Sequence, residues 1–151
     1  MPRRFTDADL AGYMTRHGMT PEFKFRANPK PKEGPSESQL QQEVMSWWAV
    51  RCQELGIPEF LLYAVPLQAA RSAQNGARMK REGARKGTPD MFLLVPSGMY
   101  SGMAIEMKKP GGKLSPEQVK FLAALDDRGY KTCVCFSGSD AVVEILRYLK
   151  R

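Results

Sequence analysis

The chain has 151 residues, of which 42% are hydrophobic, and it carries a formal net charge of +7 at pH 7. This length is typical of one domain with a short extension, and the apolar content is enough for a real core. No apolar run approaches the roughly 20 residues of a membrane span, and the polar N-terminus lacks the apolar segment of a secretory signal. We therefore expect a cytoplasmic protein that does not bind membranes.

The cysteines and the single histidine limit the chemistry further. Cys133 and Cys135 lie on the same side of one predicted strand, which is poor geometry for a disulfide, so we expect both, and Cys52, to be reduced thiols in the core. One histidine, His17, and the absence of a C-x-x-C motif argue against a zinc site.

Residues 1–35 are predicted to be a basic, proline-rich extension, and residues 36–151 the main domain. Within the extension, Asp7–His17 is predicted to form a short helix capped by Thr6. The Pro/Lys-rich segment Phe23–Pro35 indicates an extended arm, which could contact nucleic acid, contact a partner subunit or be a simple linker.

A long helix is predicted to begin at Ser36, where Ser36-Glu37-Ser38-Gln39 forms a capping-box pattern, and to end at Gly56. Its apolar positions follow helical spacing: Leu40, Val44, Trp47, Trp48, Cys52 and Leu55. Glu37 lies in the first turn, where it either complements the helix dipole or points inward as one carboxylate of a site. Glu43 on the same helix is the competing candidate for that carboxylate.

The remaining elements predict an α/β fold. Short apolar runs predict four strands: Phe60–Val65, Met91–Val95, Met103–Met107 and Tyr130–Phe136. Helices are predicted from the Ser115 cap to Gly129 and over Asp140–Leu149, while Arg71–Lys86 is expected to be a loop with a turn of helix. The resulting order, αβββαβα, predicts three layers around a mixed four-stranded sheet.

Two of these strands carry charged residues that can meet. Asp90 precedes the strand at Met91, and Glu106 and Lys108 share one face of the neighbouring strand because they are two residues apart. Charges in so apolar a strand are rare unless they are paired or bind a metal. Two carboxylates and an ammonium suit a divalent metal with a water ready for deprotonation; the alternative is a solvated cross-strand charge set.

Gln118 and a cluster of basic residues surround this predicted site. Gln118 shares the buried face of its helix with Leu122 and Leu125, so it can either close the capping box or reach into the site. The segment from Pro66 to Pro89 has six Lys or Arg residues and one acid, which suggests a polyanion drawn to the carboxylates, although a charge run is often only a solvated loop. The candidate residues for binding such a polyanion are Arg71, Arg78, Lys80, Arg81, Arg85, Lys86, Lys109 and Lys113.

At these residues the chain resembles a known nuclease family. Pro89-Asp90 followed by Glu106-Met107-Lys108 resembles the PD-(D/E)xK nuclease signature, and the element order is similar to that of its restriction-endonuclease-like core. More specifically, the region from Ser36 to Arg151 resembles the VRR-NUC family (virus-type replication-repair nuclease), especially its small stand-alone, often phage-encoded members. The further matching blocks are Glu37-x-x-x-Gln41-x-x-Val44, Ala64-Val65-Pro66, Lys80-Arg81-Glu82-Gly83, Gly87-Thr88-Pro89-Asp90 and Gly112-Lys113-Leu114-Ser115-Pro116-Glu117-Gln118.

The resemblance implies roles for particular residues. Glu37, Asp90 and Glu106 would bind Mg²⁺ or Mn²⁺ with the backbone carbonyl of Met107. Lys108 would be the catalytic lysine and Gln118 would support the site. One departure is Leu67-Gln68, where many relatives have Asn-Gly after the Val-Pro, so the function of that Asn is in doubt here.

The resemblance also implies an activity: hydrolysis of phosphodiester bonds in branched DNA, such as four-way (Holliday) junctions, by a homodimer in a bacterial cytoplasm or a phage-infected host cell. Two alternatives remain open from the sequence. One is a non-catalytic module that binds nucleic-acid junctions through the basic loop, and the other is a restriction-type enzyme that cuts linear duplex at defined sequences.

Overall fold

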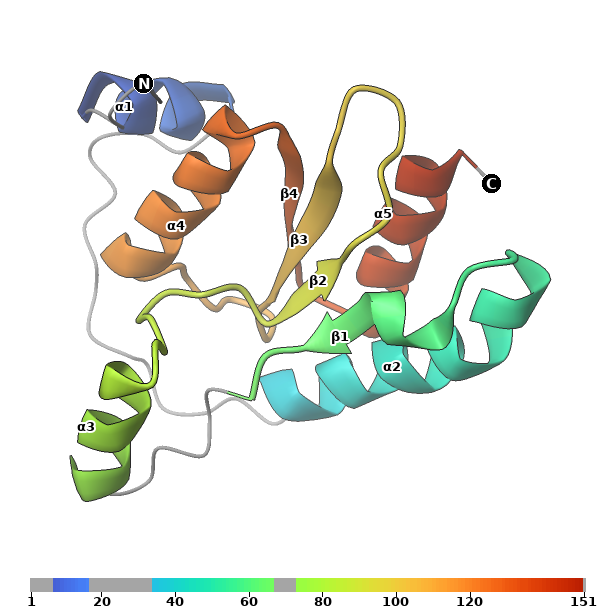
Figure 1. Cartoon of the computed structure of the whole chain (residues 1–151), viewed down its shortest axis with the longest axis horizontal. Helices are drawn as coiled ribbons and strands as arrows, with labels where there is room; N and C mark the ends of the chain where they lie inside the picture. The colour runs from blue at the N-terminus through green and yellow to red at the C-terminus, as the bar shows by residue number, and fades with distance from the viewer. Residues whose placement is uncertain (1–6, 17–33, 67–72, 151) are drawn as a thin grey trace.

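The computed structural model describes residues 7–16, 34–66 and 73–150 (Figure 1). The helices are α1 (Asp7–Arg16), α2 (Glu37–Glu54), α3 (Ala73–Arg81), α4 (Pro116–Asp127) and α5 (Gly138–Leu149). The strands are β1 (Leu62–Ala64), β2 (Met91–Leu93), β3 (Gly102–Met107) and β4 (Tyr130–Cys135).

The described strands form one four-stranded sheet in the order β1-β2-β3-β4. The β1–β2 and β2–β3 pairs are antiparallel, whereas β3 and β4 are parallel and are joined through α4. Helices α2 and α5 pack together on one side of the sheet, and α4 with α1 lies on the other (Figure 1). The predicted three-layer α/β fold around a mixed sheet is therefore confirmed.

Helix α2 begins where its sequence predicts. The Ser36 hydroxyl accepts a hydrogen bond from the Gln39 amide at 3.2 Å, and the Gln39 side chain accepts one from the Ser36 amide at 2.7 Å. Its buried face consists of Leu40, Val44, Trp48 and Cys52, which belong to the main core under the sheet. This face sets the rotation of the helix and therefore the direction of the charged residue in its first turn.

The strand predicted over Met91–Val95 ends already at Leu93, and two segments differ from their predictions in the type of structure they form. The expected strand over Phe60–Val65 begins instead with a 3₁₀ helix, Glu59–Leu61, because Trp48 donates its indole N–H to the Glu59 carbonyl at 2.8 Å and holds the chain in a tight turn. The basic segment contains a nine-residue helix, α3, rather than a single turn. Its Ala, Gln, Arg, Met and Lys residues favour helix enough to accommodate Gly76.

Helix α1 is attached to α4 on the side of the sheet away from α2. Tyr13 is buried and hydrogen-bonds to Thr132 at 3.1 Å, and Arg16 forms an ion pair with Asp126 at 2.7 Å. Thr6, His17 and residues 17–33 lie outside the described residues. The domain boundary at residue 36 stays a prediction.

The three cysteines are reduced, as expected: the sulfur atoms of Cys133 and Cys135 are 3.7 Å apart without a bond, and Cys52 is buried in the core. None of the helices in the described ranges is long and apolar enough to cross a membrane.

Candidate active site

The register of the central strands brings the two predicted carboxylates together. Met91 on β2 pairs with Ile105 on β3. Because the two strands are antiparallel, Asp90, just before Met91, and Glu106, just after Ile105, lie at the same end of the strand pair. One carboxylate oxygen of Asp90, Oδ2, accepts a hydrogen bond from the Met107 amide at 2.8 Å. This bond holds the Asp90 side chain at the end of β3, beside Glu106.

Glu106 lies at the bottom of the site, with only 1% of its surface exposed. Its Oε1 atom is 2.8 Å from the Lys108 ammonium and accepts a hydrogen bond from the side-chain NH₂ group of Gln118. Its other oxygen, Oε2, is buried and makes no hydrogen bond to the described part of the chain. Because an unsatisfied buried carboxylate oxygen is costly, this atom is well suited to bind a cation.

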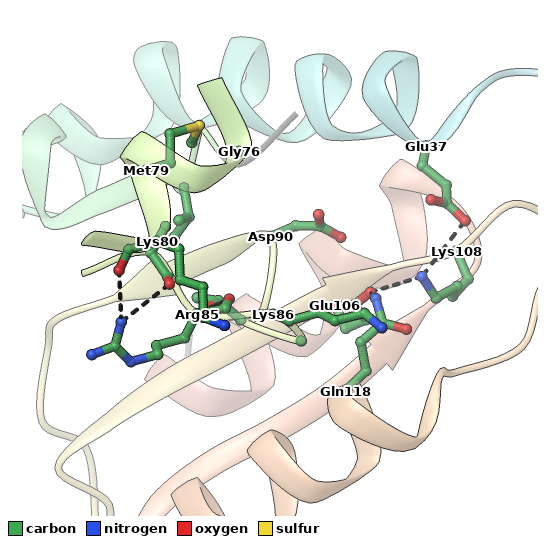
Figure 2. A pocket seen from close by; sticks show the side chains of 14 residues that line it. Glu37, Gly76, Met79, Lys80, Arg85, Lys86, Asp90, Glu106, Lys108 and Gln118 are labelled. Atoms are coloured by element: carbon green, nitrogen blue, oxygen red, sulfur yellow. Dashed lines mark hydrogen bonds and ion pairs between the residues drawn. The ribbon is translucent and has the colours of Figure 1, made fainter. Parts of the chain in front are cut away.

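The Lys108 ammonium connects two elements. It lies between Glu106 on β3 and Glu37 in the first turn of α2, 3.7 Å from the Glu37 Oε1 atom, and only 6% of the residue is exposed (Figure 2). Glu43 instead lies against Gly138, where an added Cβ would be 2.5 Å from its Oε2. Of the two candidate carboxylates on α2, Glu37 is therefore the one directed at Lys108.

Burial makes full ionisation of the carboxylate pair unfavourable. Burial, together with the nearby charge of Asp90, raises the pKa of Glu106 to about 7, although Lys108 opposes the shift. Burial also raises the pKa of Asp90, against the effect of its hydrogen bond from Met107. A divalent cation between the two carboxylates would reverse this balance, because it stabilises their charged forms.

The raised pKa of Glu106 predicts a pH-dependent stability. Its pKa rises from 4.5 to about 7 on folding, so its contribution to stability is complete below pH 4.5 and is lost as the pH rises toward 7. In metal-free buffer, Glu106→Gln should therefore leave the free energy of unfolding nearly unchanged at pH 4.5 and raise it by about 1–3 kcal/mol at pH 8. Urea unfolding in EDTA at both pH values measures this.

Glu54→Gln is the matched control for that substitution, because Glu54 is an exposed glutamate on α2 that forms an ion pair with Arg51 of the same helix. It should shift stability equally at both pH values. A Glu106→Gln protein whose stability falls with pH as steeply as that of the wild type would contradict the assignment.

A cleft of about 580 Å³ opens over these side chains. Its acidic side contains the residues just described, and its opposite wall is formed by α3 and the loop that follows it, including Met79, Lys80, Arg85 and Lys86 (Figure 2). Arg85 also donates to the Lys80 and Ala84 carbonyls, and Lys86 forms a 2.6 Å ion pair with Glu117.

The predicted basic residues divide into two groups. Lys80, Arg85 and Lys86 line the cleft. The other described residues of this set do not line the cleft and are exposed: Arg78, Arg81, Lys109 and Lys113. Arg78 forms a 3.6 Å ion pair with Glu82. Arg71 and the Leu67-Gln68 pair lie outside the described residues.

The side chains present fit a hard divalent cation with few protein ligands. Over residues 7–16, 34–66 and 73–150, no group of three or more His, Cys, Asp or Glu side chains is arranged to hold a metal. Glu37 reaches the site through Lys108, so the predicted set of three carboxylates stays a prediction. Mg²⁺, however, is commonly held by one or two carboxylates together with substrate oxygens, and Asp90 with the unsatisfied Oε2 of Glu106 matches that mode.

Gly87 is a site residue to which sequence analysis assigned no role. Its φ of +83° favours glycine, and an added Cβ would lie 2.4 Å from the backbone carbon of Glu117. The loop before β2 therefore rests directly on the first turn of α4, next to Gln118. The sequence signal was its place in Gly87-Thr88-Pro89-Asp90, but the contact itself joins segments about thirty residues apart.

Comparisons with known proteins agree with this geometry. The family model described as VRR-NUC domain matches residues 28–138. A solved structure titled "VRR_NUC domain protein" superimposes with a TM-score of 0.66 and 28% sequence identity, over 78% of this chain and 91% of that chain. A search of curated proteins found no match. The matched segment includes Asp90, Glu106, Lys108 and Gln118, and so the chain belongs to the VRR-NUC domain family, as a nuclease of the PD-(D/E)xK type.

Proposed function

We propose that this nuclease is a divalent-metal-dependent endonuclease that hydrolyses phosphodiester bonds in branched DNA, including four-way junctions. The observation that carries the proposal is the pairing of half-buried Asp90 with buried Glu106 at the floor of a cleft that has a basic wall. One oxygen of Glu106 is unsatisfied, and the Lys108 ammonium lies beside the other. Two neighbouring carboxylates with raised pKa values are stabilised in their charged forms by a metal ion, and the nearby cationic groups can bind a polyanion.

Asp90 and Glu106 would hold Mg²⁺ or Mn²⁺, with Glu37 and the Met107 carbonyl as further candidates. When bound, such an ion lowers the pKa of a coordinated water and neutralises charge on the phosphate. The protein positions its ligands in advance: the Met107 amide fixes Asp90, and Gln118 fixes one oxygen of Glu106. This leaves the second oxygen of Glu106 available as a ligand.

Lys108 has a separate role in the proposed reaction. Its ammonium lies 2.8 Å from Glu106, so a phosphate bound beside that carboxylate would also be within its reach. From there Lys108 would orient the attacking water and stabilise the negative charge that develops on the phosphate. Because the ammonium is held by acids on both β3 and α2, its position depends on the packing of α2.

The basic wall supports DNA as the substrate and structure as the basis of selection. Lys80 and Arg85 line the cleft opposite the carboxylates, where they would contact the DNA backbone. Contacts to phosphates position DNA but carry no sequence information directly. We infer selection by DNA shape, and a homodimer would place two symmetry-related clefts on the two strands cut at a four-way junction.

A substrate panel tests the proposal. Labelled four-way junction, flap, splayed-arm and linear duplex DNAs are incubated with Mg²⁺, Mn²⁺ or EDTA. We expect cleavage of branched DNA only with metal, and an affinity that falls steeply with salt. Metal-independent binding without cleavage of any substrate would favour the non-catalytic junction-binding module, and cutting of linear duplex at defined sequences would favour a restriction-type enzyme.

A further inference from the structure

An aromatic pair lies on the two strands nearest the open edge of the sheet. Tyr63 on β1 is the cross-strand partner of Phe92 on β2, and their rings are stacked, with centroids 6.0 Å apart and planes at 20°. Their strand neighbours Leu62, Met91 and Leu93 point into the core under α2 and α5. Because side chains alternate along a strand, Tyr63 and Phe92 point to the opposite face of the sheet.

That face is also the face of the active site. Asp90 is two residues before Phe92, and Glu106 is two residues beyond Ala104, the partner of Phe92 on β3. Residues two apart on a strand share a face and lie about 7 Å from each other along it. Val65, two residues beyond Tyr63, already lines the cleft. The aromatic pair therefore lies directly beyond the cleft floor, along β1 and β2.

This part of the face is open to solvent, although Phe92 itself is half-buried, whereas the part of the face over β4 is covered. Helix α4 covers β4, where Thr132 is only 2% exposed. Tyr63, by contrast, is 41% exposed, and Leu94 next to Phe92 on the same face is 44% exposed. Cross-strand packing accounts for the contact between the two rings, but not for an uncovered apolar surface beside a polar cleft.

We propose that Tyr63 and Phe92 are a stacking platform for an unpaired base next to the phosphate that is cut. The inference rests on the proposed function, because it needs nucleic acid in the cleft. An aromatic surface beside a basic groove is the usual means of holding single-stranded nucleic acid, since every base has a face that can stack. Here Lys80 and Arg85 form the basic wall of the cleft. Tyr63 and Phe92 form the aromatic surface.

The platform gives a physical reason for structure selection without sequence readout. Bases inside an intact duplex are already stacked and paired, so they reach the platform only at the cost of leaving the helix. For an unpaired nucleotide at a branch point this free-energy cost is smaller, because no base pair has to be broken. The nuclease should therefore favour DNA that has an unpaired nucleotide beside the cleavage position.

A fluorescent base tests this directly and without cleavage. A branched DNA carries 2-aminopurine at an unpaired position beside the cut site, and the protein is added in EDTA. Wild-type protein and Tyr63→Phe should quench the fluorescence, whereas Tyr63→Leu should not. We expect Tyr63→Leu to weaken binding of this DNA about tenfold and to leave binding of a fully paired duplex unchanged.

The controls distinguish a loss of base stacking from a loss of folding and from the binding of another partner to this face. Phe60→Leu is the matched control, because Phe60 is 76% exposed in the preceding 3₁₀ helix, outside the β1–β2 strand pair, and should leave the quenching intact. Thermal unfolding checks that each variant is folded. Equal loss of affinity for all DNAs, or a changed oligomeric state in Tyr63→Leu, would overturn the platform and assign the surface to another role, such as contact with a second copy of the chain.

The outcomes also distinguish this inference from the proposed function. If the wild-type protein cleaves branched DNA with metal and Tyr63→Leu quenches and cleaves equally well, only the platform is wrong. If the wild-type protein quenches the probe but cleaves no DNA with any metal, the platform stands and the catalytic proposal is wrong.

Discussion

Asp90→Asn is expected to lower the rate of metal-dependent DNA cleavage by at least about a thousandfold, while affinity for DNA in EDTA changes by less than about twofold. The amide of Asn can still accept the hydrogen bond that the Met107 N–H gives to Asp90, so the local fold is kept. What is lost is the charge that a divalent cation needs beside Glu106. Single-turnover cleavage of a four-way junction and titration calorimetry with Mn²⁺ measure the two effects separately.

Lys108→Met should reduce cleavage by about a hundredfold or more through a different cause. Methionine is an unbranched apolar side chain of similar length to the lysine stem, but it lacks the ammonium that lies between Glu106 and Glu37. Metal binding should then persist or tighten, because a competing cation has left the carboxylates. Glu54→Gln, on an exposed part of α2, should cleave as the wild type does. Cleavage at a normal rate by both site variants would show that the chemistry occurs elsewhere.

Gly87→Ala should destabilise the fold by about 2–4 kcal/mol and reduce cleavage as well. The added Cβ would lie 2.4 Å from the backbone of Glu117, on a residue whose φ of +83° is already unfavourable for alanine. This steric clash can be relieved only if the loop before β2 moves away from α4. That movement would displace Gln118 from Glu106 and Lys86 from Glu117, so one methyl group would disturb both walls of the cleft.

Gly129→Ala is the control for backbone strain alone. Gly129 has a nearly identical φ of +81° and lies just past the far end of α4. Among the described residues, the nearest atom to its added Cβ would be the Ser101 hydroxyl at 3.9 Å. It should cost about 1–2 kcal/mol and leave cleavage at saturating metal unchanged. Chemical denaturation and single-turnover cleavage measured on both proteins provide the comparison. Equal losses of stability and activity in the two variants would refute a role for the loop contact.

The parts of this structure that sequence predicts well are those set by neighbouring residues. The helix starts at Ser36 and Ser115 are local patterns, and both capping boxes form. The prediction that Asp90 and Glu106 lie close together needed one further assumption, that the two apolar runs joined by a turn pair as antiparallel strands. The register of β2 and β3 agrees with this assumption. Alternation along β3 then placed Lys108 beside Glu106.

The parts that sequence could not supply depend on contacts between distant segments. The 3₁₀ turn before β1 is held by Trp48 from α2, and no pattern within the turn indicates that partner. The choice between Glu37 and Glu43 depends on the rotation of α2 in the core. The exposure of Tyr63 depends on how far α4 extends across the sheet, which follows from packing rather than from the alternation of β1.

The shortness of β1 has a consequence for the behaviour of the molecule in concentrated solution. An edge strand with aromatic side chains is ordinarily a template on which other chains add by intermolecular pairing, the first step of aggregation. Here the edge strand spans only Leu62–Ala64, and Pro66 soon after it has no amide hydrogen to donate. The protein can thus leave an aromatic face uncovered at the rim of its sheet while offering incoming strands almost no backbone to pair with.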